Sequence, residues 1–120
     1  MDDFLNIWGC FFKIEGIVQG VSFRRHTKQE AKRLGIRGYC MNSKNSSVVG
    51  EIQGPLDRYM KMKAWLTHVG SPLSRIENAE FQNERLIFNY TYPQFRIKSE
   101  DNDPNAERLL NADDSDDNMT

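Results

Sequence analysis

The run from Gly16 to Arg24, with sequence GIVQGVSFR, has the clearest chemical content in this chain. Two glycines, Gly16 and Gly20, follow an apolar segment, and a segment rich in arginine and lysine follows them. Glycine lets a backbone turn and approach a ligand closely, and the first N–H groups of a helix point toward negative charge. Arg24 adds a planar guanidinium, which suits phosphate or carboxylate. The sequence therefore predicts an anion-binding loop.

Two glycines after a strand can also form a simple turn with no ligand. Arg24 favours the binding interpretation because its side chain reaches the same space as the loop N–H groups, whereas Arg25 is expected to point elsewhere on the helix. Asn42 stands directly before a predicted turn, and local sequence alone indicates a turn-forming asparagine. His26 and His68 are lone histidines on predicted helices and indicate surface or core side chains rather than ligands or bases.

The elements that must position these residues follow from hydrophobic spacing. Residues 8–14 are rich in aromatic side chains and predict a buried strand. The apolar side chains of residues 23–34 recur at helical spacing, and Gly35 is a typical helix stop. Residues 36–41 and 47–53 form a predicted hairpin around a turn at 43–46, in which Asn45 is expected to take the left-handed position.

A second helix is predicted to begin at Gly54-Pro55 and to end at residues 70–72. Its expected inner stripe consists of Leu56, Tyr59, Met60, Lys63, Leu66 and Val69. Residues 76–81 predict a fourth strand, residues 86–92 a strand or ordered loop, and residues 95–97 a short last strand. The order is β-α-β-β-α-β with a short final piece. This predicts an α+β, ferredoxin-like sandwich in which two helices cover one face of an antiparallel sheet.

Length and composition limit the class of protein. A chain of 120 residues with 38% hydrophobic and 28% charged residues suits one soluble globular domain, and it has no apolar run of membrane-spanning length. Its acidic start does not resemble a secretory signal, so we expect a cytoplasmic protein. Cys10 and Cys40 allow one disulfide in principle, but two buried free thiols are favoured in that compartment.

Charge is distributed unevenly along the chain. Residues 99–120 carry eight acids and one base, a net charge of −7, whereas residues 1–98 carry fifteen bases and nine acids. The composition predicts a folded domain over 1–98 and an acidic, disordered tail over 99–120. A tail that folds back on the basic domain as an electrostatic lid is the less favoured alternative.

The glycine-rich run closely resembles the first signature of the acylphosphatase family. Gly38-Tyr39-Cys40-Met41-Asn42, followed by Val48, Gly50, Gln53, Gly54 and Pro55, resembles the second. Both motifs occur in the family's order and separation, and the resemblance covers about residues 11–98. It implies the same βαββαβ fold that the spacing predicts.

The resemblance also implies hydrolysis of acyl phosphates to a carboxylate and inorganic phosphate. Arg24 and the cradle Gln19, Gly20, Val21, Ser22 and Phe23 would bind phosphate, and Asn42 would hold the attacking water. A carboxylate leaving group is already a stable anion, so placing water in line and stabilising phosphoryl charge lowers most of the barrier. The implied enzyme needs no metal or cofactor, and the expected partner is a small acyl phosphate, with no nucleic acid and no membrane. We expect a monomer.

The chain departs from the family's pattern at three places. Ser46 stands where the family usually has glycine near the end of the hairpin turn, and Ile17 stands where a basic residue is common, which weakens attraction of an anionic substrate. Ser99 follows Lys98 where the family often has an aromatic residue. The acidic tail lies outside the resemblance.

Two other classes of function remain open from the sequence. Arg37-Gly38-Tyr39 matches the start of an aromatic RNA-binding motif, but Cys40-Met41-Asn42 then departs from it, and the segment falls on the second strand rather than the third. A catalytically weak module that only binds phosphate is the other alternative. Hydrolysis is favoured over both because both key side chains are present.

Overall fold

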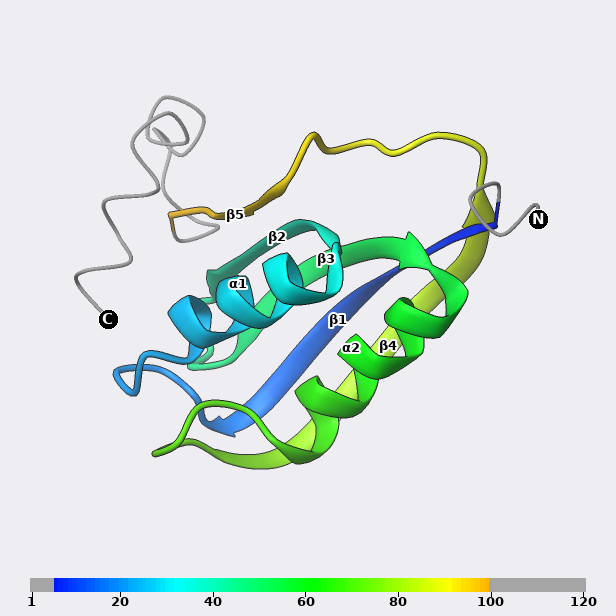
Figure 1. Cartoon of the computed structure of the whole chain (residues 1–120). Helices are drawn as coiled ribbons and strands as arrows, with labels where there is room; N and C mark the ends of the chain where they lie inside the picture. The colour runs from blue at the N-terminus through cyan, green and yellow to red at the C-terminus, as the bar shows by residue number, and fades with distance from the viewer. Residues whose placement is uncertain (1–5, 100–120) are drawn as a thin grey trace.

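The computed structural model describes residues 6–99, and the predicted tail beyond Ser99 lies outside the described residues. The elements follow the predicted β-α-β-β-α-β order with a short fifth strand (Figure 1). Their bounds are β1 Ile7–Ile17, α1 Phe23–Leu34, β2 Arg37–Asn42, β3 Val48–Pro55, α2 Leu56–His68, β4 Arg75–Ile87 and β5 Phe95–Ile97. In residues 86–92, the first two belong to β4 and the rest form a connection without regular structure.

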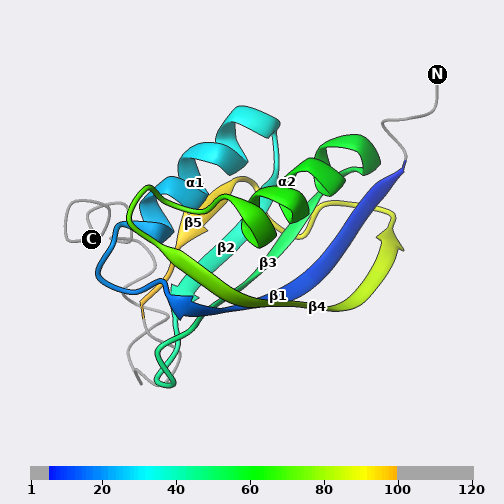
Figure 2. The same ribbon diagram turned by 90° about the horizontal axis from the view of Figure 1, so that it is seen from below.

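The five strands form one sheet in the order β4-β1-β3-β2-β5. Three neighbouring pairs are antiparallel, as predicted, whereas β5 pairs with β2 in parallel. The parallel pair arises because the chain leaves β4 at one edge, crosses the molecule and enters beside β2 at the other edge (Figure 1). Both helices cover the same face of the sheet (Figure 2). The fold is the predicted ferredoxin-like α+β sandwich with a mixed sheet.

The strand directions gather several segments at one end of the sheet. There β1 ends and α1 begins, and β2 turns into β3 (Figures 1 and 2). The parallel pairing brings the end of β5 to the same place, since Ile97 lies opposite Cys40. This end therefore carries both sequence motifs that the resemblance singled out.

The helices bury one face each, although one predicted stripe is partly wrong. Helix α1 buries the predicted Phe23, Thr27, Ala31 and Leu34, and Gly35 ends it in the left-handed conformation. Helix α2 buries Tyr59, Met62 and Leu66. Leu56, Met60 and Val69, expected on the inner stripe, are 46%, 53% and 61% exposed. Met62 lies in the core instead. The buried face of α2 is therefore rotated relative to the face that the spacing of apolar residues predicts.

Two further predictions concern the hairpin turn and the cysteines. The left-handed residue of the turn is Ser46, with a φ of 68°. The prediction that Asn45 takes this conformation is wrong by one residue. Both cysteines are buried free thiols, as predicted. Burial raises the pKa of Cys10 to about 11, which keeps it in its unreactive thiol form. Among the described residues, no helix combines the length and apolar character needed to cross a membrane.

Candidate active site

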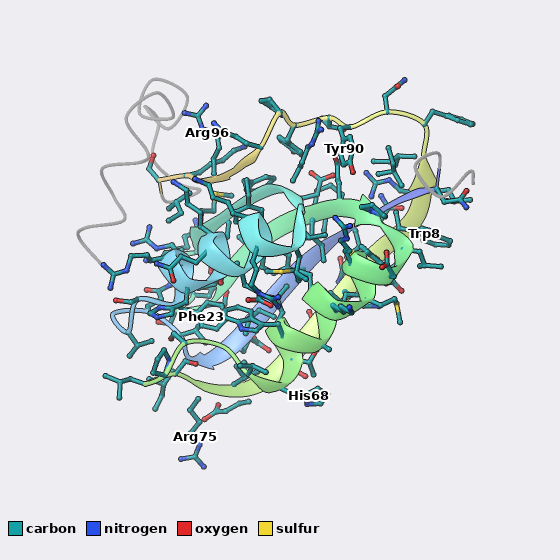
Figure 3. The ribbon with its side chains drawn as sticks, viewed as in Figure 1. Trp8, Phe23, His68, Arg75, Tyr90 and Arg96 are labelled. Atoms are coloured by element: carbon teal, nitrogen blue, oxygen red, sulfur yellow. The ribbon has the colours of Figure 1, made fainter. Side chains whose placement is uncertain are left out.

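The glycine-rich loop is held at both ends by buried apolar side chains. Val18 and Phe23 are each 1% exposed, and Val21 packs partly against the core. The Phe23 ring lies 5.8 Å from the ring of Trp65, between the two helices (Figure 3). Because these side chains point into the core, the loop offers its backbone to solvent. Val21 and Phe23 therefore belong to the predicted cradle through their main chain.

The two glycines of the loop serve different purposes. A side chain on Gly16 would overlap the carbonyl oxygen of Arg75, so this glycine permits close approach of β1 and β4. Gly20 has a φ of 77° and open space around it. Glycine is favoured at this position by the backbone conformation and not by a lack of room for a side chain. Ser22 also has a positive φ, of 58°, immediately before α1. The loop thus enters the left-handed region of backbone conformation at two residues before the helix begins.

The loop and first helical turn present a set of unused hydrogen-bond donors. The first bond of the helix runs from the N–H of His26 to the carbonyl of Ser22 at 3.0 Å. Ser22 does not cap the helix with its side chain, and the first turn contains no acidic residue. Within residues 6–99, five backbone N–H groups here donate to no protein acceptor, namely those of Gly20, Val21, Phe23, Arg24 and Arg25. Such a group of amides at a helix N-terminus forms an anion site.

Arg24 is the second residue of α1 and is half-buried. In the described part of the chain its guanidinium makes no ion pair or hydrogen bond. A half-buried guanidinium that no carboxylate neutralises keeps its five donors and full charge for a ligand. The structure therefore places the predicted arginine beside the unused amides with its charge uncompensated by the described residues.

Asn42 is the last residue of β2 and lies opposite Val48 of β3. Its side-chain Oδ1 is buried and has no hydrogen-bond partner among the described residues. Buried polar atoms are nearly always hydrogen-bonded, so this oxygen can accept a hydrogen bond from a molecule bound beside it. The turn-forming role that local sequence favoured belongs instead to Ser43 and Ser46, which are bonded through the turn.

Gln19 differs from the other cradle residues because its side chain has a partner in the protein. Its Nε2 donates to the carbonyl oxygens of Ser43 and Ser47, at 3.0 Å and 2.9 Å. The sequence showed no sign of this contact, since a glutamine inside a glycine-rich loop has no local pattern that identifies a distant carbonyl. The contact joins the loop to the turn that follows Asn42.

His26 also contacts the loop. Its ring Nδ1 lies 2.9 Å from the carbonyl oxygen of Ser22, which the backbone N–H of His26 also approaches. His68 ends α2 and is exposed, which is one of the two placements, surface or core, that were predicted for it (Figure 3). His26 is therefore a side chain that supports the loop backbone, a role that helical spacing alone did not indicate.

The aromatic segment considered for RNA binding lies on β2, and its side chains contact the β4–β5 connection. The Arg37 guanidinium lies 3.7 Å from the ring centre of Tyr90, and the Tyr39 ring lies 5.6 Å from that of Tyr92 (Figure 3 shows Tyr90). The Lys98 ammonium lies 3.9 Å from the centre of the Tyr39 ring. Through these contacts the β2 segment packs against the β4–β5 connection and holds it on the sheet.

Similarity to known proteins agrees with this geometry. The family model described as Acylphosphatase matches residues 10–97. Acylphosphatase-1 of Drosophila melanogaster is 47% identical over 103 residues, covering 86% of this chain and 83% of that protein. Acylphosphatase-2 of Rattus norvegicus is 44% identical over 87 residues, covering 72% of this chain and 90% of that protein.

A solved structure shows the same fold. The structure of an acylphosphatase from Coxiella burnetii superposes with a TM-score of 0.66 at 28% identity, covering 77% of this chain and 93% of that chain. The residues that match the family model include both motifs and all of the sheet except residues 7–9 of β1. From the loop and its unused donors, from the second motif at the same end of the sheet, and from these matches, the chain belongs to the acylphosphatase family of enzymes.

Proposed function

We propose that this protein hydrolyses acyl phosphates to a carboxylate and inorganic phosphate, with Arg24 and Asn42 as its catalytic residues. The observation that carries the proposal is the meeting of three features at one end of the sheet, each without a partner among residues 6–99: the loop amides, the Arg24 guanidinium and the Asn42 amide oxygen. Together they supply donors for a phosphoryl group and an acceptor for water.

The phosphoryl oxygens of the substrate bind the N–H groups of Gly20, Val21 and Phe23 and the guanidinium of Arg24. These donors are fixed before substrate arrives, because Val18 and Phe23 anchor the loop in the core. Preorganised donors stabilise charge on the equatorial phosphoryl oxygens without reorganising during the reaction. The N-terminus of α1 adds its positive dipole end to the same site.

Asn42 binds a water molecule through its side-chain amide and directs it at phosphorus. The water oxygen forms a bond to phosphorus while the bond from phosphorus to the acyl oxygen breaks, and that electron pair leaves with the carboxylate. One water proton passes to a phosphoryl oxygen of the substrate. The leaving carboxylate is a weak base, so a neutral amide suffices and no general acid is required.

The proposal is tested by the hydrolysis of benzoyl phosphate, an aryl acyl phosphate, by the full chain in buffer with and without EDTA. We expect catalysed release of benzoate and phosphate, with the same rate in both buffers, because every group in the proposed step belongs to the chain or the substrate. Absence of catalysis together with binding of inorganic phosphate would indicate a phosphate-binding module instead. Loss of activity with EDTA would overturn the mechanism.

A further inference from the structure

The side-chain amide of Gln19 connects the two halves of the proposed site. Its Nε2 carries two hydrogens, and the two carbonyl oxygens that it contacts, those of Ser43 and Ser47, flank the β2–β3 turn. Both serines are almost fully buried, at 8% and 1% exposed. The donors of this side chain are therefore committed to the turn, and the side chain offers none to a phosphoryl group.

The turn that Gln19 contacts is cross-linked by its own hydrogen bonds. The N–H of Ser43 donates to the carbonyl of Ser47 at 2.9 Å, and the two hydroxyl oxygens lie 2.6 Å apart. The N–H of Asn45 donates to the Ser43 hydroxyl at 3.2 Å. Asn42 directly precedes this unit and pairs with Val48, which directly follows it. A contact that holds Ser43 and Ser47 in place therefore also restricts the position of the Asn42 backbone.

Between its buried anchors, Val18 and Phe23, the loop has an exposed stretch at Gly20. Gly20 directly follows Gln19 and has open space where a side chain would stand. Val18 on the other side is buried. The buried anchors fix the loop to the core, and the Gln19 side chain adds a direct hydrogen-bonded link from the loop to the β2–β3 turn.

We propose that Gln19 is a positioning residue, which fixes the distance between the phosphate-binding loop and Asn42. The inference rests on the proposed function, because it assigns the loop to the phosphoryl group and Asn42 to the water. In-line attack requires the phosphoryl group and the attacking water to be held in a precise relative position, and a misplacement of about 1 Å costs roughly 100-fold in rate. Gln19 supplies this constraint through the side chain, while its neighbours supply the ligand contacts through the main chain.

The first test compares Gln19→Met, which keeps the side-chain length and removes the N–H donors, with Gln29→Met, an exposed glutamine on α1. The quantities measured are kcat for benzoyl phosphate and the inhibition constant of inorganic phosphate. We expect kcat to fall by about 10- to 100-fold in Gln19→Met while phosphate inhibition changes by less than about threefold. Gln29→Met should match the parent chain. An unchanged kcat in Gln19→Met, or an equal loss of kcat and phosphate binding, would overturn the inference.

A second variant, Gln19→Glu, gives a readout that a loss of packing does not produce. An ionised carboxylate repels the two carbonyl oxygens, whereas the protonated acid donates one hydrogen bond to them. The kcat of Gln19→Glu relative to the parent chain should therefore rise as pH falls through the titration of this carboxyl, and Gln19→Met should show no such rise. The same relative profile in both variants would contradict the bridge.

The outcomes for Gln19 and for the proposed function are distinct. If the parent chain does not hydrolyse benzoyl phosphate, or if Asn42→Ala keeps the parent kcat, the proposed function fails. If Asn42→Ala loses activity and Gln19→Met keeps it, only the positioning role of Gln19 fails. Inhibition by inorganic phosphate confirms in each variant that the loop is folded.

Discussion

The thiol of Cys40 on β2 donates to the carbonyl oxygen of Arg24, with Sγ and O 3.9 Å apart. Sulfur is a weak donor, so this contact adds little energy, but it shows that the first turn of α1 sits directly over β2. Asn42 lies two residues further along the same strand. The two proposed catalytic side chains are therefore carried by elements in direct contact.

Replacement of Arg24 should weaken the binding of the phosphoryl group. In Arg24→Ala, we expect kcat/KM for benzoyl phosphate to fall by the factor that corresponds to a loss of about 1.5–3 kcal/mol of transition-state stabilisation, the range for hydrogen bonds to charged groups. Phosphate inhibition should weaken in parallel, and Arg24→Lys should recover part of the charge but not the planar donor pair. Steady-state kinetics with phosphate as inhibitor measure both effects.

The matched control is Arg33→Ala on the same helix. Arg33 is exposed and is already paired with Glu30, far from the loop. If this variant lost as much kcat/KM as Arg24→Ala, general attraction by the basic helix would explain the effect, and a direct contact from Arg24 would not.

The acid stability of the domain should depend in part on Glu84. Hydrogen bonds from Lys63 and from the Tyr59 hydroxyl, the latter at 2.6 Å, hold the pKa of Glu84 below its usual value of 4.5. A lowered pKa stabilises the folded state above the usual pKa, and this contribution is lost as pH falls through the folded-state pKa. Because Glu84 is largely exposed, we expect only a few tenths of a kcal/mol.

Urea unfolding of Glu84→Gln and of the parent chain at pH 7 and below pH 4 checks this. The parent should be the more stable at pH 7, and the difference should shrink in acid. Glu77→Gln, an exposed acid on the same strand, is the control. A difference that stayed constant between the two pH values would mean that the charge of Glu84 is not the cause.

Ile17 is the place to test attraction of the substrate. Its side chain is 52% exposed and lies opposite Arg75, which Figure 3 shows projecting into solvent. Ile17→Lys should raise kcat/KM for benzoyl phosphate a few-fold at low salt, because it adds positive charge beside the loop, and the gain should vanish near 1 M salt, where the screening length is about 3 Å. The like charge of Arg75 should cost a few tenths of a kcal/mol in stability.

The control for this variant is Ile17→Gln, which is polar but neutral. A similar gain in kcat/KM from glutamine, or a gain that persisted at high salt, would show that removal of the exposed isoleucine matters rather than the new charge.

We propose that residues 99–120 lie outside the folded domain. The family match ends at residue 97, Ile97 is fully buried, and the N–H of Lys98 donates to the carbonyl of Cys40 at 2.9 Å. A chain that ends at Lys98 should therefore keep one cooperative unfolding transition in urea, monitored by far-UV circular dichroism. Loss of cooperativity would refute this boundary. A rise in kcat/KM at low salt on deletion would instead support the electrostatic lid.

The sequence was sufficient for the order of the elements and for the residues of the loop, because glycine spacing and helical periodicity are local. It could not identify the face of α2, where Met62 rather than Met60 is buried, since both lie near the apolar stripe and packing decides between them. The parallel entry of β5 and the contact from Gln19 to Ser43 are both long-range. No local pattern predicts the pairing of β5 with β2 or the hydrogen bond of Gln19, because the residues in each contact are far apart in the sequence.

In the proposed mechanism Arg24 binds the phosphoryl group and Asn42 directs the water, and the kinetics of Asn42→Ala test this separation of roles most directly. We expect kcat for benzoyl phosphate to fall by about 100-fold or more, because the water is no longer directed, while the inhibition constant of inorganic phosphate changes by less than about threefold. Asn45→Ala, in the exposed turn nearby, should behave as the parent chain. A full kcat in Asn42→Ala, combined with weakened phosphate inhibition, would contradict the account.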